Sequence, residues 1–279
     1  MCNPLNPQPI KDSMAFPAAF ARRYRLILLV AGACGLGISQ LRGQAASIQP
    51  ATPRVPVLVE LFTSEGCSDC PPADALLAKL DATQPIPGAQ TIVLSEHVTY
   101  WNHQGWRDPF SFDGMTERQE EYGRRFGLDS SYTPQMVVDG TEQLVGSNGR
   151  ALVAAVQKEI AIAKQAIAIE GAKWEHGAAQ FAIHANPPAG ARVVAVLAAD
   201  ATHSEVARGE NAGRTLHHTA VVRVMKEFDS NVADGRELKL AGGPLSQKDE
   251  ASGPVRLVVF LVDRKTGRVL GAAQQILPR

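Results

Sequence analysis

Several features that would assign a protein to a class at once are missing from this sequence. The chain has 279 residues, a formal net charge of zero and only 6% aromatic residues. Because there is no basic excess, composition does not support a protein that binds nucleic acid or a polybasic membrane surface protein. Four cysteines are too few for a disulfide-rich scaffold or for several zinc sites. The hydrophobic content of 45% also differs from the composition of disordered proteins.

The apolar run near the start of the chain is too short to cross a membrane. It extends from Leu26 to Ile38, which is 13 residues, whereas a spanning helix needs about 20. Three arginines within residues 22–25 precede the run, and small residues at 43–45 follow it. This order is typical of a secretory signal peptide with its cleavage site. Translation would then start at Met14. We therefore expect residues 1–45 to be a signal or export segment and the protein to be periplasmic or secreted.

Two alternatives for this segment stay open. The residues Ala31-Gly32-Ala33-Cys34 loosely resemble a lipoprotein processing box, although a leucine is missing three residues before the cysteine. A lipoprotein anchored at Cys34 is therefore the first alternative. An uncleaved membrane anchor is the second.

Cleavage near Ala45 would leave the mature chain with two cysteines. Cys2 and Cys34 would be removed with the export segment, and Cys67 and Cys70 would remain. Two cysteines with two residues between them, in an oxidising compartment, most simply form one short disulfide.

Apolar runs and chain breakers predict two regions after the export segment. In residues 46–166 strands and helices alternate, which favours an α/β layer fold. In residues 167–279 seven short apolar runs are separated by turns, which favours a smaller β-sandwich. The elements expected in the first region are strands at 57–62, 91–94, 134–138 and 143–145 and helices at 71–80, 115–126 and after Ser147 as its cap. The strands expected in the second region are 167–174, 179–184, 192–198, 220–227, 237–240, 255–262 and 269–276.

The two cysteines lie where a strand and loop lead into a helix, and this position has chemical consequences. The free N–H groups and the dipole at a helix N-terminus stabilise a thiolate, which is the nucleophilic form of cysteine. A second cysteine nearby can then attack a mixed disulfide and release the product. The pattern predicts that Cys67 attacks and that Cys70 resolves.

Three stretches resemble a bacterial family of secreted thioredoxin-like proteins that has no assigned function. They are Glu60–Asp74, residues 97–106 with their His-Val-Thr-Tyr-Trp motif and Gly105-Trp106, and Tyr132–Gly140. The likeness covers most of residues 56–279. The first stretch also resembles the active-site loop of thioredoxin, and Tyr132-Thr133-Pro134 resembles its cis-proline loop. The resemblance implies an α/β thioredoxin-like domain followed by a smaller β-sandwich domain, and it brings no reaction with it.

The same resemblance implies roles for individual residues. Glu60 occupies the place of thioredoxin's buried acid, which would accept the proton of the resolving thiol. The alternative for Glu60 is a solvated strand residue. Thr133 and Pro134 would present their backbone to a bound peptide, and the bond between them would be cis. No cofactor is expected.

The chain departs from thioredoxin around the cysteines. Gly66 replaces an aromatic residue, one extra residue follows the strand carboxylate, and Pro71-Pro72 suggest a helix that begins nearer Cys70. Glu65 and Asp69 place carboxylates beside the thiols, which disfavours the thiolate. We therefore expect Cys67 to be less acidic than in strong oxidants. A measured pKa below about 5 would contradict this, against about 8.5 for a free cysteine.

Residues 97–132 hold eight of the chain's 16 aromatic residues. Within this insert (97–130), Tyr100, Trp101 and Trp106 could line a substrate groove or a lid. The alternative is a small satellite core that packs a long loop. His217 and His218, further along the chain, are expected at the surface of a strand.

These observations favour a thiol-disulfide oxidoreductase that acts on protein or peptide thiols and disulfides, with a membrane or periplasmic redox partner. A second hypothesis is a copper or zinc protein that uses both cysteines with His97 or His103. A third is a non-catalytic binding module that uses the aromatic insert. The non-catalytic alternative for Cys67 and Cys70 is a structural disulfide, although a disulfide that closes so short a loop adds little stability to the folded protein.

Overall fold

The computed structural model describes residues 53–246 and 253–279. The expected export segment and the alternative lipidation site at Cys34 lie outside the described residues. Among the helices of the described part, none is long and apolar enough to span a membrane.

The elements up to residue 166 follow the order that the sequence predicts. They are β1 (Val55–Thr63), α1 (Pro71–Thr83), β2 (Ala89–His97), α2 (Asp113–Phe126), β3 (Gln135–Val138), β4 (Glu142–Val145) and α3 (Gly149–Glu159). Helix α1 begins with two prolines, whose missing N–H groups cost least in a first turn. Helix α2 ends at Gly127, which adopts the left-handed conformation (φ 66°) that glycine allows. The cap of α3 is Asn148, not Ser147, since the Asn148 side chain accepts a hydrogen bond from the N–H of Ala151.

All seven strands expected after residue 166 are present. They are β5 (Ile167–Glu175), β6 (Ala178–Ala185), β7 (Ala191–Glu205), β8 (Thr215–Asp229), β9 (Asp234–Ala241), β10 (Val255–Asp263) and β11 (Val269–Leu277). Two 3-10 helices, η1 (Ser230–Ala233) and η2 (Gly243–Ser246), flank β9. Strands β7 and β8 are 15 residues each, about twice the expected length, and they form a long hairpin.

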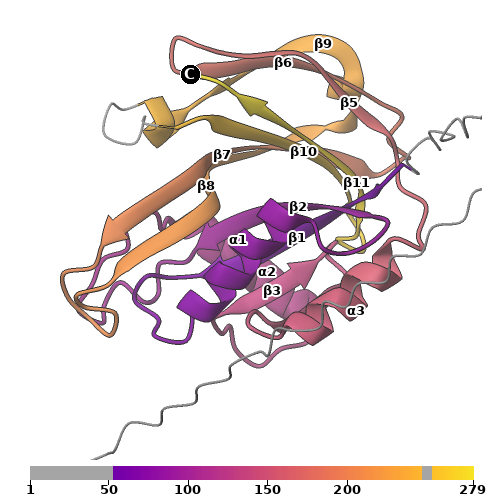
Figure 1. Ribbon diagram of the computed structural model, residues 1–279. Helices are drawn as coiled ribbons and strands as arrows, with labels where there is room; N and C mark the ends of the chain where they lie inside the picture. Colours follow the sequence, from indigo (N-terminus) through magenta and orange to yellow (C-terminus); the bar gives the residue numbers. More distant parts are fainter. Residues whose placement is uncertain (1–52, 247–252) are drawn as a thin grey trace, which may run out of the picture. The chain divides into compact units, whose positions relative to one another are not determined.

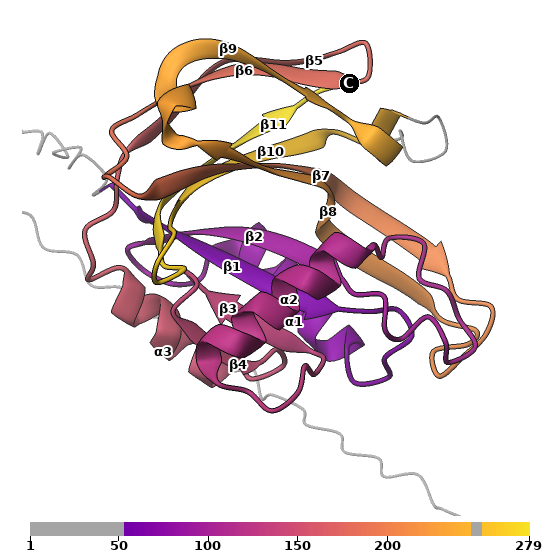
Figure 2. The ribbon, with the colours of Figure 1, turned by 180° about the vertical axis from the view of Figure 1, so that it is seen from behind.

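The strands of both regions join in one sheet. An eight-stranded mixed sheet has the order β11-β10-β7-β8-β2-β1-β3-β4, and β5-β6-β9 form a separate three-stranded sheet. The junction is between β2 and β8, which run parallel with Ser95 opposite Val221. Figures 1 and 2 show β8 descending beside β2 from the layer beneath the small sheet.

The expected fold class is therefore wrong. The chain is mostly β, with one large mixed sheet and one small sheet, and it is not an α/β thioredoxin-like domain followed by a β-sandwich. The physical reason is edge pairing. Strands β2 and β8 would each leave a row of unpaired backbone groups if their regions folded separately, and pairing them removes both edges. Period and composition reveal strands, but they do not reveal which strands are neighbours.

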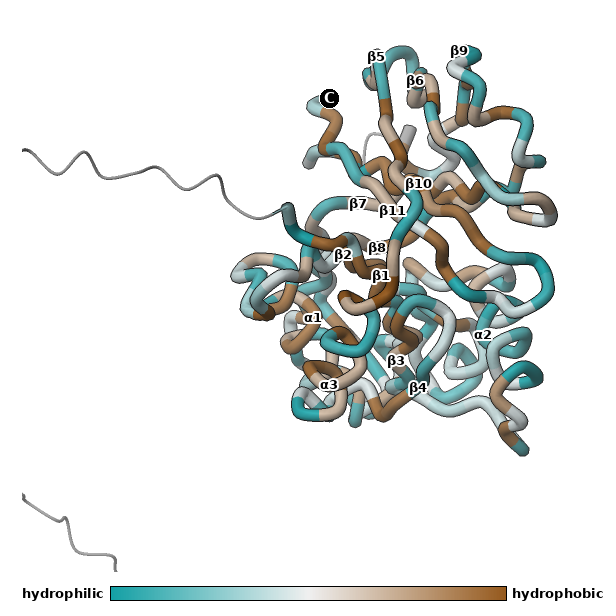
Figure 3. Tube along the Cα trace, turned by 90° about the vertical axis from the view of Figure 1, so that its right-hand side faces the viewer, coloured by the Kyte–Doolittle hydropathy of each residue, from teal (hydrophilic) through white to brown (hydrophobic). Residues whose placement is uncertain are grey.

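Three apolar clusters hold these layers together. On one face of β1, Val57, Val59 and Leu61 pack with α1 and α3, while on the other face Leu58 packs with Met115 of α2. Residues of the three-stranded sheet, such as Phe181, pack against β7 and β10. Figure 3 shows hydrophobic residues gathered along the strands between the layers. The loops after β1 and β2 and the tip of the β7–β8 hairpin are left at one end, where the candidate site lies.

Candidate functional site

Cys67 and Cys70 form a disulfide, as the sequence predicts. The pair lies in the loop between β1 and α1, and Cys70 is the residue before the helix, close to where the two prolines suggested that the helix begins. Both cysteines are buried, with 1% and 0% of their surfaces exposed. The disulfide is therefore covered, and the side chains around it decide what can reach it.

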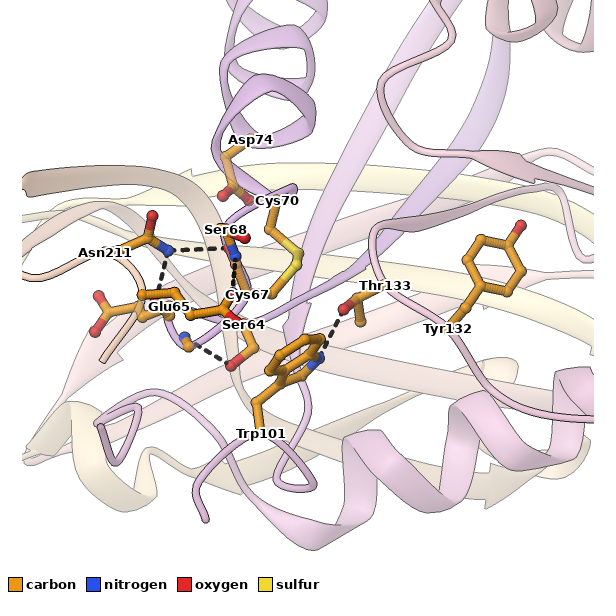
Figure 4. The surroundings of a disulfide bond; sticks show 12 residues. Ser64, Glu65, Cys67, Ser68, Cys70, Asp74, Trp101, Tyr132, Thr133 and Asn211 are labelled. Atoms are coloured by element: carbon orange, nitrogen blue, oxygen red, sulfur yellow. Dashed lines mark hydrogen bonds between the residues drawn. A yellow bond between two sulfur atoms is a disulfide. The ribbon is translucent and has the colours of Figure 1, made fainter. Parts of the chain in front are cut away.

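The loop before β3 faces the disulfide (Figure 4). Its Thr133–Pro134 bond is cis, as the resemblance implied. The Thr133 hydroxyl accepts a hydrogen bond of 2.8 Å from the indole N–H of Trp101. The carbonyl of Pro134 accepts from the N–H of Gly146 at 2.9 Å. The expected peptide-binding backbone at Pro134 is thus already paired within the protein.

The three aromatic residues expected at the site, Tyr100, Trp101 and Trp106, each have a different environment. Trp101 packs on the disulfide loop so closely that a Cβ on Gly66 would lie 3.1 Å from the Trp101 Cβ, which explains the glycine before Cys67. Tyr100 donates a hydrogen bond of 3.1 Å to Gln119, and burial raises its pKa to about 12. Trp106 donates from its indole N–H to Glu65 at 2.8 Å. The structure therefore brings Trp101 and Trp106 to the loop that carries the cysteines, while Tyr100 lies beside Trp101.

The tip of the β7–β8 hairpin, Val206–Arg214, lies over the same loop, and no pattern in the residues predicts this contact. The side chain of Asn211 donates to the backbone oxygens of Glu65 and Cys67, both at 2.9 Å. The N–H of Ser68 donates to Glu210 at 3.1 Å. Asn211 is buried, so its two hydrogen bonds are shielded from water, whereas the bond between Ser68 and Glu210 is exposed. Hairpin tip and aromatic insert together close over the disulfide.

Glu65 is a buried carboxylate that joins these parts. Besides Trp106, it accepts hydrogen bonds from Ser204 of β7 and contacts His218 of β8, whose Nε2 lies 3.2 Å from its Oε1. Its backbone N–H donates to Asp108 at 2.9 Å. Glu65 therefore connects the cysteine loop to the long hairpin and to the insert.

His218 is buried, which contradicts the expected surface position, whereas its neighbour His217 is exposed. Burial by itself lowers the pKa of His218, but the adjacent carboxylates of Asp74 and Glu65 outweigh this and raise it to about 10. His218 is therefore a cation at neutral pH. Nothing in the period of β8 distinguishes His218 from a solvated residue, because its carboxylate partners are about 140 residues away in the chain.

His97 and Asp108 form a second buried pair beside the first. Nδ1 of His97 lies 2.7 Å from the Asp108 carboxylate, and the ring of His97 meets the ring of His218 edge to face at 4.6 Å. Burial alone would raise the pKa of Asp108, but His97 and two backbone N–H groups lower it below its ordinary value. Asp108 is thus ionised.

Glu60 is buried, so the alternative of a solvated carboxylate is excluded. Its hydrogen-bonding side chains come from α2: Arg118 binds Oε1, and the Tyr122 hydroxyl donates to Oε2 at 2.6 Å. Burial and the Glu60 charge raise the pKa of neighbouring Glu96 well above its usual value. The role of Glu60 as the acceptor of the resolving thiol's proton stays a prediction. The polar side chains that bind Glu60 lie on α2.

The described residues offer little to a metal ion. Among them, no group of three or more histidine, cysteine, aspartate or glutamate side chains is arranged to hold one. His97 is engaged with Asp108, and His103 lines an open hollow of about 760 Å³ together with Tyr100, Arg107 and Phe112. The hollow adjoins the insert and is a candidate for contacts with a substrate.

Comparison with known proteins places the chain in a family. The model of the DUF1223 family, described as a protein of unknown function, matches residues 58–261. The chain belongs to this family. No curated protein matches. Among solved structures, a crystal structure of a protein from Agrobacterium tumefaciens is similar, with 24% identity and a TM-score of 0.60 over 82% of this chain and 97% of that one. HBP35 of Porphyromonas gingivalis has 13% identity and a TM-score of 0.48 over 82% and 77% of the two chains.

The likeness to the Agrobacterium protein supports the fold of this DUF1223 member and says nothing about its reaction. The features that bear on its reaction are therefore the disulfide and the residues around it.

Proposed function

We propose that this DUF1223 protein is a periplasmic or secreted thiol-disulfide oxidoreductase that acts on protein or peptide thiols. The observation that carries the proposal is the Cys67–Cys70 disulfide at the start of α1, with the cis Thr133–Pro134 loop facing it. A disulfide that closes so short a loop constrains the unfolded chain little, so stability is a weak reason for it. Thiol-disulfide exchange is a stronger reason for the presence of this disulfide.

The exchange reaction balances without a cofactor. A substrate thiolate attacks Cys67, the bond between Cys67 and Cys70 breaks, and Cys70 leaves as a thiolate. A second substrate thiolate then attacks the mixed disulfide, so that the substrate leaves oxidised by two electrons and Cys67 leaves as a thiolate. Protons from the two substrate thiols balance the two protein thiols. A disulfide partner, membrane-bound or periplasmic, would accept the two electrons and restore the bond between Cys67 and Cys70.

The buried disulfide sets a condition on this reaction. Because Cys67 is only 1% exposed, a protein thiol can reach it only after the covering residues move. The part expected to move is the hairpin tip, whose hydrogen bonds to the cysteine loop come from Asn211 and Glu210 and can be replaced by water. Substrate contacts would then come from Thr133, Tyr100, Trp101 and Trp106.

A redox titration tests the proposal. The full chain carrying Cys2→Ser and Cys34→Ser is equilibrated in metal-free dithiol buffers of known potential, and alkylated thiols are counted by mass. We expect a reversible two-electron couple between about −120 and −270 mV, the range of exchange catalysts. A Cys70→Ser variant should then trap substrates as mixed disulfides on Cys67, and the matched Cys67→Ser variant should trap far fewer.

Two results would overturn it. A potential below about −300 mV would identify a structural disulfide. Thiols that stay reduced in oxidising buffer would instead favour the hypothesis of a metal-handling protein.

A further inference from the structure

Several buried polar atoms near the disulfide have no hydrogen-bond partner. They include Oδ1 of Asp74, Nδ1 of His218 and Nε2 of His97. Oδ1 of Asp74 and Nδ1 of His218 lie 3.9 Å apart, which is beyond hydrogen-bonding distance. A carboxylate oxygen has two lone pairs, so this oxygen has room for a second donor besides the Nδ1 of His218 that faces it.

The sequence position of Asp74 shows which donor that is. Asp74 follows Cys70 by four residues, and its N–H donates to the Cys70 carbonyl at 3.1 Å. Side chains four residues apart on a helix have Cβ atoms about 5–6 Å apart, and helical side chains lean toward the N-terminus. Figure 4 shows the Asp74 carboxylate directed from α1 toward the cysteine loop. Both residues are buried, so water competes little for the carboxylate.

His218 supplies the charge that an ionised Asp74 needs in this setting. A buried carboxylate without a cation is costly, and His218 faces Asp74 from β8. The other ionisable groups facing His218 are Glu65 from the cysteine loop, His97 from β2 and, through His97, Asp108 from the insert. The cation thus lies between two carboxylates, and one of them still has a free oxygen.

We propose that Asp74 accepts the proton of the Cys70 thiol, with His218 as the positioning residue whose positive charge faces the Asp74 carboxylate. This inference rests on the proposed exchange function. When Cys70 resolves the mixed disulfide on Cys67, which is the reverse of the first exchange step above, the proton of Cys70 passes to Oδ1 of Asp74, and the Cys70 sulfur forms its bond to the Cys67 sulfur. The bond from Cys67 to the substrate sulfur breaks, and the substrate leaves as a thiolate. No oxidant beyond the mixed disulfide is needed.

The ionised carboxylate also stabilises the neutral thiol. It accepts the S–H of Cys70 and repels a thiolate, so both effects raise the pKa of that thiol. Removal of the charge should therefore lower the pKa of Cys70. Removal of His218 leaves the buried carboxylate of Asp74 without its facing positive charge, and the effect of Asp74 on Cys70 should then shrink.

The test measures the Cys70 thiol alone, by its ultraviolet thiolate absorbance as a function of pH. The full chain carries Cys2→Ser, Cys34→Ser and Cys67→Ser, so that no disulfide partner remains. We expect Asp74→Asn to lower the pKa of Cys70 by about one unit or more. The matched control is Asp69→Asn, which removes the same charge beside Cys70 at an exposed position and should shift the pKa far less. In a His218→Asn background, Asp74→Asn should shift it by less than half as much.

Each result decides the question. An Asp74→Asn shift no larger than that of Asp69→Asn, or a shift to higher pH, would overturn the role of Asp74. A full shift in the His218→Asn background would overturn the role of His218. If Asp74→Asn does not fold, as judged by circular dichroism, Asp74→Ser replaces it. The titration does not require exchange, so a shift without a reversible redox couple would overturn the proposed function alone.

Discussion

Asn211, on the tip of the long hairpin, binds the backbone oxygen of Cys67 across 144 residues of sequence. The same amide group binds Glu65, and both distances are 2.9 Å. At roughly 1 kcal/mol for each hydrogen bond, the two bonds stabilise the closed position of the hairpin tip over the disulfide by about 2 kcal/mol. We expect Asn211→Ala to speed reduction of the disulfide by dithiothreitol about 30-fold, because opening becomes easier by that amount.

The matched control for this prediction is Asn148→Ala, which removes the helix cap of α3. Rates are followed by stopping the reaction with an alkylating reagent and counting thiols by mass. Equal rates for both variants would show that the hairpin tip does not limit access.

The cation at His218 makes stability depend on pH. Its folded pKa of about 10 exceeds the ordinary value of 6.5, so its contribution is fully present below about pH 6.5 and is lost as the pH rises through 10. Between these values the free energy of unfolding should fall by about 1.4 kcal/mol per pH unit from this group. Urea unfolding at pH 7, 8 and 9 measures the slope.

His218→Gln should remove most of this slope, while His217→Gln at the exposed neighbouring position should keep it. A wild-type slope that survives in the His218→Gln variant would assign the pH dependence to other groups.

Arg118 is the cation of the buried cluster around Glu60. With 14% of its side chain exposed, it faces Glu60 and Glu96, both of which are fully buried. Removing one partner of a buried ion pair costs about 3–5 kcal/mol, because the other charge is left without compensation. We expect Arg118→Met to destabilise the protein by this amount in urea unfolding.

The control is Arg124→Met on the same helix, where the side chain is 70% exposed and its ion pair is weak. It should change stability by less than about 0.5 kcal/mol. Comparable losses in the two variants would contradict the buried cluster.

Gly146 lies where no side chain fits. A Cβ there would lie 2.8 Å from Leu61, 3.0 Å from Pro134 and 3.1 Å from Ala73. Gly146→Ala should therefore cost about 1–3 kcal/mol by overpacking. Gly123→Ala, in the middle of α2 with nothing within 4 Å, should instead stabilise by about 0.5–1 kcal/mol, since alanine favours the helix. Thermal melting of both variants measures the opposite signs.

Local features of this protein were predictable from its sequence. The apolar run of β1, the prolines at the start of α1 and Gly127 after α2 each act on neighbouring residues, so the pattern locates the elements. The disulfide was predictable too, because Cys67 and Cys70 lie three residues apart in the sequence.

Contacts between distant segments were not predictable. The pairing of Ser95 with Val221 decides the fold class, yet neither strand carries a signal that names its neighbour. The same holds for His218, whose burial depends on Glu65 and Asp74, and for Asn211, which reads as an ordinary turn residue. Glu60 was correctly singled out as unusual, but only the structure shows that Arg118 and Tyr122 are its partners.

The cover over the disulfide has a consequence for the order of events while the chain is made. Cys67 and Cys70 leave the ribosome before Asn211, which follows Cys67 by 144 residues. Strand β8, which carries His218, follows later still. The two thiols therefore have no cover from the hairpin tip throughout this interval. The bond between them can be made early and sealed afterwards by the strands that arrive last.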